Sequence, residues 1–350
     1  MAVSEPRCVL ITRFSALGDV AMTLPVVYDV CRANPDTRFI VLTRPLPAKL
    51  FINAPENLTV EAIDLNLYRG LRGLMRLCSE IRAKFPETDT VADLHDVMRT
   101  KVIRTWFRLH GVRSYHINKG RLGRRALTRR RNKVLLPLPT MRSRYCEVFY
   151  RAGLRHAERF RNLFAQTPAD PALYAAATPP KQPGERWIAI APFARHAGKI
   201  YPADQMEQVV ATLSSRPDHR IFLLGAGSEE TNILGRWAMK YDRTVNMAML
   251  SLGLEAELAL LHACDALVSM DSANMHMASL VGLRTISVWG ATHPYCGFMG
   301  WRQQKADAVQ LDMVCRPCSV FGNKPCFRGD YHCLRGIPPS FILERLDATP

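Results

Sequence analysis

The chain has 350 residues, 48% of them hydrophobic, which is enough to build about two domains. It has no apolar run of the ~18 residues that a membrane helix needs, and its first apolar stretch is too short for a secretory signal. These features argue against a membrane-spanning or secreted protein and predict a cytoplasmic one. We expect its ten cysteines to be mostly reduced or metal-bound there.

Apolar runs and helical periodicities alternate along the first half of the chain. Short apolar runs predict strands at 8–14, 38–45, 59–64 and 89–96, and an amphipathic pattern predicts a helix at 67–85. Strands that alternate with helices form right-handed crossovers, which build a parallel sheet covered on both faces.

A proline-rich stretch interrupts this pattern at 166–184 and is typical of a linker. After it, a second series begins, with predicted strands at 187–193, 220–227, 266–270 and 284–290 and a helix at 202–216. We therefore predict an α/β protein with two doubly wound domains. The expected division is an N-terminal domain at 1–166, a linker at 167–184 and a C-terminal domain at 185–350.

Three strand-to-helix turns carry residues that suit a binding site, because ligands of open parallel sheets bind beyond the carboxyl ends of the strands. Unpaired N–H groups and the helix dipole make the following helix N-terminus a site for anions. The first turn, "RFSALGDVAMTLP" (13–25), has Gly18 for a tight turn and Asp19 at the head of the helix. Asp19 alone is either a helix cap or a functional carboxylate.

The other two turns lie in the second series. "APFARHAGKIYP" (191–202) contains Lys199, which is either an exposed loop lysine or a point charge that meets a phosphate. "SMDSANMHMASLVG" (269–282) leaves a strand through Asp271 and carries His276 one turn into a helix. These residues are either a cap with a packed histidine or part of a ligand site.

Taken together, the three turns resemble glycosyltransferase family nine, the ADP-heptose:lipopolysaccharide heptosyltransferases. The resemblance covers most of the chain, with the blocks in the same order. It implies a GT-B fold, in which two Rossmann-like domains face a cleft. It also implies that the N-terminal domain binds the acceptor and the C-terminal domain binds the nucleotide sugar.

The resemblance implies a donor site in the C-terminal domain. The family lysine on the donor phosphates matches Lys199, and the turn from Asp271 lies against the diphosphate. Glycine usually stands in the family where this chain has Ala273, which is still small enough for close approach. Backbone groups at 249–251 are expected to face the adenine. The full expected donor set is Lys199, Glu229 (at the ribose), Asp271, Ser272, Ala273, Asn274 and His276 (supporting the phosphate or the loop).

The family's proposed catalytic base matches Asp19. An inverting transfer needs one group to take the proton of the attacking acceptor hydroxyl, which a positioned carboxylate can do. Lys199 and the 271–274 turn can stabilise the departing diphosphate by charge alone. No Asp-x-Asp motif is present, so we expect catalysis without a metal or other cofactor.

The charge of the chain is strongly positive, with a net +16 and a pI of about 9.7. The basic segment, residues 119–133, holds eight lysines and arginines and no acid. It is either a solvated loop or a landing site for a polyanion. Zinc-finger spacing, aromatic RNA platforms and heptads are all missing, which argues against nucleic acid.

We assign the basic segment to the N-terminal domain and expect it to attract an anionic glycolipid at the inner face of the cytoplasmic membrane. The expected acceptor-binding residues are Arg13, Ser15, Arg129, Arg130 and Arg131.

Four cysteines cluster near the C-terminus, at Cys315, Cys318, Cys326 and Cys333, with the spacing C-x2-C-x7-C-x6-C. Thiols at this density are a candidate site for structural zinc, although the loops are shorter than in common zinc ribbons. Reduced packing thiols and disulfides are the alternatives.

Three other functions were weighed against the transferase. A Rossmann dehydrogenase is disfavoured because the first strand is not followed by G-x-G-x-x-G. A polyanion-binding protein on an enzyme-like scaffold and a related transferase that uses another nucleotide sugar both stay open.

Overall fold

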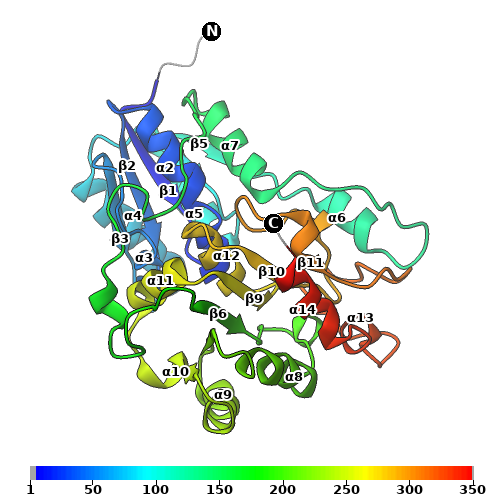
Figure 1. The fold of residues 1–350 in the computed structure, drawn as a ribbon. Helices are drawn as coiled ribbons and strands as arrows, with labels where there is room; N and C mark the ends of the chain where they lie inside the picture. Colours follow the sequence, from blue (N-terminus) through cyan, green and yellow to red (C-terminus); the bar gives the residue numbers. More distant parts are fainter. Residues whose placement is uncertain (1–4, 349–350) are drawn as a thin grey trace. The chain divides into compact units, whose positions relative to one another are not determined.

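A computed structural model describes residues 5–348 (Figure 1), and its chain divides into two compact units. The first unit comprises the residues up to Lys119 together with Pro139–Leu163. The second comprises Gly120–Leu138 and the chain from Phe164 onward. Among residues 5–348, no helix combines the length and the apolar character that crossing a membrane requires.

The first unit contains one sheet of five parallel strands in the order β3-β2-β1-β4-β5. The strands are β1 (Cys8–Thr12), β2 (Arg38–Thr43), β3 (Leu58–Ala62), β4 (Thr90–Asp93) and β5 (Arg113–His116). The helices are α1 (Leu17–Ala21), α2 (Leu24–Ala33), α3 (Pro45–Ala48), α4 (Gly70–Lys84), α5 (Met98–Leu109) and α7 (Met141–Arg151).

The core of the first unit follows from these patterns. All five residues of β1 are buried, as expected of a central parallel strand that is covered on both faces. In α4, Leu74, Leu77, Cys78 and Ile81 are buried, and their spacing of three and four residues places them on one face of the helix. Leu77, Cys78 and Ile81 belong to one apolar cluster with Cys8 and Leu10 of β1.

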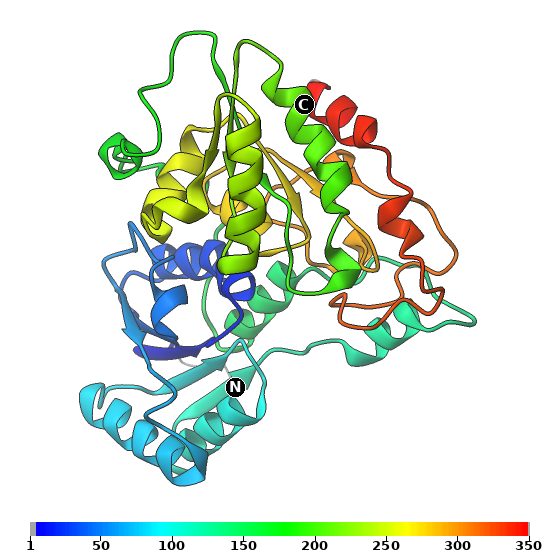
Figure 2. The same ribbon diagram turned by 90° about the horizontal axis from the view of Figure 1, so that it is seen from below.

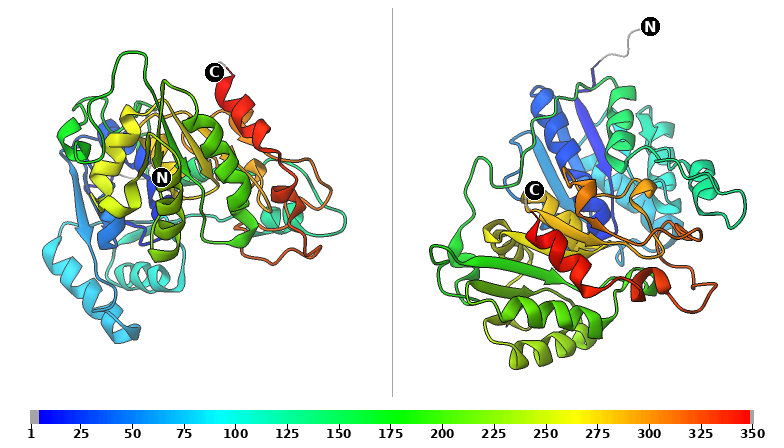
Figure 3. Two further views of the ribbon diagram at one scale, coloured as in Figure 1. Left: turned by 60° about the horizontal axis from the view of Figure 1, so that its bottom comes forward. Right: turned by 45° about the vertical axis from the view of Figure 1, so that its right-hand side comes forward.

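The second unit contains one sheet of six parallel strands in the order β11-β10-β9-β6-β7-β8. The strands are β6 (Arg186–Ala191), β7 (His219–Leu223), β8 (Thr244–Asn246), β9 (Ala266–Met270), β10 (Thr285–Val288) and β11 (Ala308–Val309). The helices are α6 (Arg121–Thr128), α8 (Ala203–Ser214), α9 (Ser228–Lys240), α10 (Met247–Leu250), α11 (Leu254–Ala263), α12 (Ala273–Leu280), α13 (His332–Arg335) and α14 (Pro339–Asp347). Figure 3 shows α14 lying alongside α8.

Both sheets have the same doubly wound order when their strands are counted from β1 and from β6. The chain order reverses between β1 and β4 in the first unit and between β6 and β9 in the second. The prediction of two doubly wound domains is therefore confirmed. The short strands β5, β8 and β11 were not predicted, since few apolar residues mark them.

All of the basic segment except Lys119 lies outside the first unit, so its assignment to the N-terminal domain is wrong. Most of it lies in Gly120–Leu138, which packs on the second unit (Figure 2). Lys133 Nζ donates to the carbonyl oxygens of Cys315 and Pro317 at 2.7 and 2.9 Å. Leu138 N–H donates to Tyr295 O at 2.9 Å. Composition identified the segment as basic but did not predict helix α6 or the residues against which the segment packs.

The predicted linker at 167–184 also packs against the second unit. It contains a short 3-10 helix, η1 (Pro171–Tyr174), and the Tyr174 ring lies edge-on to Trp187 with centroids 6.1 Å apart. Besides Gly120–Leu138, the second unit accordingly includes the chain from Phe164 onward and not only from residue 185. The prolines showed where the α/β pattern is interrupted, but they did not show whether the segment packs against a domain.

Candidate functional site

In the second unit, a lysine side chain lies at the carboxyl ends of β6 and β9, between which the strand order of the sheet reverses. Lys199 ends a 3-10 helix, η2 (Ala197–Lys199), that follows β6, and Asp271 directly follows β9. Lys199 Nζ lies 2.8 Å from Asp271 Oδ2, and the two side chains are 16% and 4% exposed. The buried carboxylate fixes the lysine, whose ammonium group retains donors for a second anion.

Glycines pack the loops around Lys199 too closely for side chains. Ala291 N–H donates to Gly198 O at 2.8 Å. A Cβ on Gly198 would lie 2.8 Å from Gly322 O. Gly322 itself has a left-handed backbone with φ of 73°, and a Cβ there would lie 2.6 Å from Lys199 Cγ. The cysteine-rich tail therefore presses directly on the methylene chain of the lysine.

Arg316 anchors this tail to the loop that follows β10. It is buried, and its guanidinium donates to the carbonyl oxygens of Trp289 and Thr292 at 3.1 and 3.0 Å and to Gly290 O at 2.5 Å. The carbonyl oxygen of Leu311 also accepts from it. A buried cation that satisfies so many backbone acceptors fixes the loop on which Ala291 meets Gly198.

The N-terminus of α12 lies at the same edge of the sheet. Its N-cap residue, Ser272, has an extended backbone and makes no side-chain cap hydrogen bond. The first-turn N–H groups and the positive end of the helix dipole are thus left for an anion. Ala273 and Asn274 are half-buried at this turn, and His276 is buried one turn further on. The structure brings these four predicted residues to the side of the sheet that holds Lys199 and Asp271.

The predicted ribose and adenine contacts lie on neighbouring elements. Glu229 is exposed in the first turn of α9, and its carboxylate forms no ion pair within residues 5–348. The adjacent Glu230 instead accepts from Ala226 N–H at 2.8 Å and closes the loop after β7. Residues 249–251 lie at the exposed end of α10. The roles expected for Glu229 and for this backbone stay predictions.

The first unit holds a carboxylate at the matching position, where β1 and β4 end. Asp19 lies in the first turn of α1, which follows β1. Its Oδ2 lies 2.7 Å from Arg13 Nη2 and accepts from Ala16 N–H at 3.2 Å. The Asp19 side chain is 31% exposed and that of Arg13 only 6%. Arg13 thus fixes the carboxylate from the protein interior and leaves part of it accessible.

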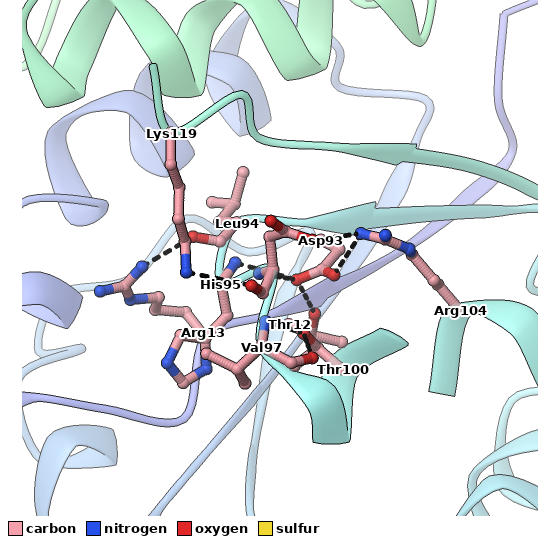
Figure 4. Close-up of polar contacts among 10 residues, drawn as sticks. Thr12, Arg13, Asp93, Leu94, His95, Val97, Thr100, Arg104 and Lys119 are labelled. Carbon is pink, nitrogen blue, oxygen red and sulfur yellow. Dashed lines mark hydrogen bonds and ion pairs between the residues drawn. The ribbon is translucent and has the colours of Figure 1, made fainter. Parts of the chain in front are cut away.

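A polar network at the end of β4 supports this arrangement (Figure 4). Arg13 Nη1 donates to Leu94 O at 2.8 Å. The fully buried Asp93 accepts from Thr12 Oγ1 at 3.2 Å and pairs with Arg104 Nη1 at 2.9 Å. Because Thr12 ends β1 and Asp93 ends β4, these contacts lock together the two strands that carry the site.

His95 is the second titratable group of this network. Phe14 N–H donates to His95 Nδ1 at 3.4 Å, which makes Nε2 the protonated nitrogen of the neutral ring. Burial, together with the charges of Arg13 and Lys119, lowers the pKa of His95 from 6.5 to about 3. The imidazole is therefore neutral near the candidate base, and the charged groups there are Arg13, Lys119 and Asp19.

The five predicted acceptor-binding residues do not come together. Arg13 is engaged with Asp19 and is buried, whereas Ser15 is half-buried in the same unit. Arg129, Arg130 and Arg131 belong to the second unit. The Arg130 guanidinium stacks over the Phe327 ring at 4.7 Å from its centroid. The contacts of Arg13 identify it as a residue that positions Asp19. That these five residues bind the acceptor stays a prediction.

The four tail cysteines line one pocket and all have free thiols. Burial raises the pKa of Cys333 to about 11 and also raises that of Cys318, so both thiols are neutral. Within residues 5–348, no group of three or more His, Cys, Asp or Glu side chains is arranged to hold a metal ion. Structural zinc at this cluster stays a prediction.

Sequence reasoning missed His95 and Gly322. The signal for His95 was available, because "ADLHD" ends a predicted strand of the same sheet as Asp19, and parallel strands end at one edge. No local signal could have found Gly322, since its closeness to Lys199 depends on how the tail folds back.

Comparison with known proteins places these features among glycosyltransferases. The sequence model of the family described as "Glycosyltransferase family 9 (heptosyltransferase)" matches residues 114–325. The chain is 22% identical over 153 residues to lipooligosaccharide heptosyltransferase 2 of Campylobacter jejuni, covering 43% of this chain and only 46% of that one. It thus spans about half the length of that relative.

Two further relatives align along most of the chain. Lipopolysaccharide heptosyltransferase 1 of Pseudomonas aeruginosa is 24% identical over 325 residues, which are 89% of this chain and 85% of that one. The solved structure of ADP-heptose lps heptosyltransferase II from E. coli superposes with a TM-score of 0.69 at 17% identity, covering 97% of both chains. That likeness establishes the fold, which is GT-B.

Proposed function

The chain belongs to glycosyltransferase family 9, and from this premise we propose that it is an inverting glycosyltransferase. We propose that it moves a heptose, or a related sugar, from an ADP-sugar to an inner-core lipopolysaccharide or lipooligosaccharide acceptor. The observation that carries the proposal is the pairing of Lys199 with Asp271 beside the uncapped N-terminus of α12. This is a built site for a diphosphate at the reversal point of a doubly wound sheet.

In the proposed reaction, an acceptor hydroxyl attacks the anomeric carbon of the donor sugar. The new bond forms between that oxygen and the anomeric carbon as the bond from this carbon to the diphosphate oxygen breaks. The hydroxyl proton passes to the Asp19 carboxylate, and the nucleoside diphosphate departs with the bonding electron pair. Attack from the side opposite the leaving group inverts the anomeric configuration.

Residues of opposite charge have different roles in the proposed reaction. The Asp19 carboxyl group is held by Arg13 and is partly exposed, which suits a general base. Lys199 and the first-turn N–H groups of α12 provide fixed positive charge where negative charge develops on the diphosphate. With these groups in place, the proposed transfer requires no cofactor. A structural zinc at the cysteines would serve the fold of the tail only.

Relatives support the choice of donor and acceptor. The E. coli structure is that of an ADP-heptose enzyme, and the relatives from C. jejuni and P. aeruginosa act, by their names, on lipooligosaccharide and lipopolysaccharide. We therefore propose an adenine nucleotide and an anionic glycolipid acceptor at the inner face of the cytoplasmic membrane. The runner-up is a transferase of the same fold that takes another nucleotide sugar.

A thermal-shift panel tests the donor. ADP and ADP-sugars should raise the melting temperature more than UDP, GDP or CMP sugars at equal concentration, since the ligand with the lower Kd for the folded protein stabilises it more. Transfer from ADP-heptose to a purified heptose-deficient lipooligosaccharide, with inversion read by NMR, then tests the reaction. Selective stabilisation by another nucleotide would favour the runner-up.

A further inference from the structure

The helix α6 exposes one face that mixes arginine and leucine. At ~100° per residue, Arg121, Leu122, Arg125 and Arg129 fall within about 100° of one another around the axis. All four are exposed, and Leu122 is 85% exposed. Leu127, on the opposite side, is fully buried. The helix therefore turns its basic and apolar face outward and packs through its other side.

The segment after α6 carries further exposed leucines on a backbone that is held in place. Val134 N–H donates to Ala126 O at 3.1 Å, which folds the segment back along the helix. Lys133 is anchored on the carbonyl oxygens of Cys315 and Pro317. Leu135 and Leu136 remain 51% and 65% exposed. A fixed backbone thus presents these side chains to the solvent.

The stretch of sequence that forms this surface lacks acidic residues. No acidic residue occurs in the sequence between Asp96 and Glu147. Among residues 5–348, no carboxylate forms an ion pair with Arg125, Arg129 or Arg131. Exposed leucines among unpaired arginines are costly in water but match an interface that is apolar inside and anionic outside.

We propose that this α6 patch, formed by Leu122, Arg125, Arg129, Arg131, Leu135 and Leu136, docks the protein on an anionic lipid bilayer. The leucines enter the boundary between headgroups and acyl chains, and the arginines lie among the lipid phosphates. Nucleic acid fits less well, because a polyanion of phosphates gives three exposed leucines no apolar partner. The proposal goes beyond the transferase function and does not require it.

Vesicle sedimentation with the full chain tests the proposal. The probes are vesicles of phosphatidylcholine alone and of phosphatidylcholine mixed with phosphatidylglycerol, without glycolipid or sugar nucleotide. The protein should bind the mixed vesicles and not the neutral ones, and salt should weaken binding. Because no donor or acceptor is present, the result is independent of the proposed transfer reaction.

Two variants separate the contributions. Arg125→Gln/Arg129→Gln/Arg131→Gln should lower the partition coefficient on the order of 10²-fold and flatten its salt dependence. Leu122→Ser/Leu135→Ser/Leu136→Ser should lower it by about tenfold or more while keeping the salt dependence. The matched control removes three exposed arginines of the first unit, Arg69→Gln/Arg72→Gln/Arg108→Gln, and should stay within about twofold of wild type.

Several outcomes overturn the proposal. The proposal is wrong if the wild-type protein does not bind the mixed vesicles. It is also wrong if the control variant loses as much binding as the patch variants. Leucine substitutions without effect would reduce the surface to a general polyanion site. A higher KM for a lipid-free acceptor oligosaccharide, with vesicle binding intact, would return the arginines to acceptor binding. ADP-induced thermal shifts in every variant report that the second unit is folded.

Discussion

The two units share one strand order and place opposite charges at its reversal point. In the first, a buried arginine holds a partly exposed carboxylate, Arg13 with Asp19 at 2.7 Å. In the second, a buried carboxylate holds a lysine, Asp271 with Lys199 at 2.8 Å. The strand order therefore determines where a ligand contacts each sheet. The more exposed member of each pair, the outer partner, determines whether that place accepts a proton or binds an anion.

The inner partner does a different task from the outer one. Arg13 and Asp271 are the more buried members of their pairs, and burial makes an unpaired charge expensive. Each is thus committed to its partner and positions it. Removing the outer member should impair function, and in either unit it should also leave a buried charge without its ion-pair partner.

The largest effect is expected from Asp19→Asn. Asparagine can still accept from Ala16 N–H, but it cannot take a proton, so turnover should fall by roughly 10²-fold or more. The measurement is kcat with saturating donor and acceptor, with Asp36→Asn, an exposed position in the same unit, as the control. If the variant turned over at a near-normal rate while binding ADP, Asp19 would be only a helix cap and a partner for Arg13.

The next effect concerns Lys199. Lys199→Met combined with Asp271→Asn removes both charges and avoids an unpaired buried carboxylate. Affinity for ADP should fall on the order of tenfold to a hundredfold, while adenosine, which lacks the diphosphate, should bind as before. Calorimetry with both ligands measures this, and Lys305→Ala, an exposed lysine of the second unit, is the control. Equal losses for ADP and adenosine would move the diphosphate away from Lys199.

Much of this comparison was readable from the sequence. The runs predicted as strands at 38–45 and 266–270 contain β2 and β9, because a buried parallel strand needs consecutive apolar residues. Asp19, Lys199 and Asp271 were found because parallel strands end at one edge of the sheet. The first rule uses only neighbouring residues in the sequence, and the second needs only the order of the strands along the chain.

Long-range contacts were not readable. The basic segment looked like part of the first domain because of its place in the sequence. Lys133 donates to the carbonyl oxygens of residues 315 and 317, more than a hundred positions away, and belongs with them to the second unit. The contacts of Arg13 were likewise not predicted, since no sequence pattern shows that its guanidinium turns inward toward Asp19 and Leu94.

A smaller effect should separate two glycines of the cysteine-rich tail. Gly322 and Gly329 both have left-handed backbones, with φ of 73° and 79°, so alanine strains both. Only at Gly322 would the new Cβ meet Lys199, because nothing lies within 4 Å of that position at Gly329. Gly322→Ala should therefore weaken ADP by about tenfold, and Gly329→Ala should cost stability alone. If both variants bound ADP equally well, the tail would not position Lys199.

The smallest effect is a pH dependence of stability that each unit contributes through one histidine. Burial lowers the pKa of His95 in the first unit to about 3 and that of His293 in the second to about 4, from 6.5 in both cases. Below pH 6.5 the unfolded chain binds protons at these sites that the folded chain does not. The free energy of unfolding should therefore fall as the pH drops from 6.5 toward these values, by at most about 1.4 kcal/mol per pH unit for each histidine.

Glutamine at either position removes the titrating group while leaving an acceptor for the N–H groups of Phe14 and Tyr295, which now donate to His95 and His293. His95→Gln and His293→Gln should each flatten part of the acid limb in urea unfolding curves, and the double variant should flatten both parts, because sites in different units add. An acid limb unchanged in His95→Gln would show that this histidine takes up its proton at the same pH in the folded and in the unfolded chain. The imidazole beside Asp19 would then carry a charge, and the opposition between a proton-accepting first unit and an anion-binding second unit would weaken.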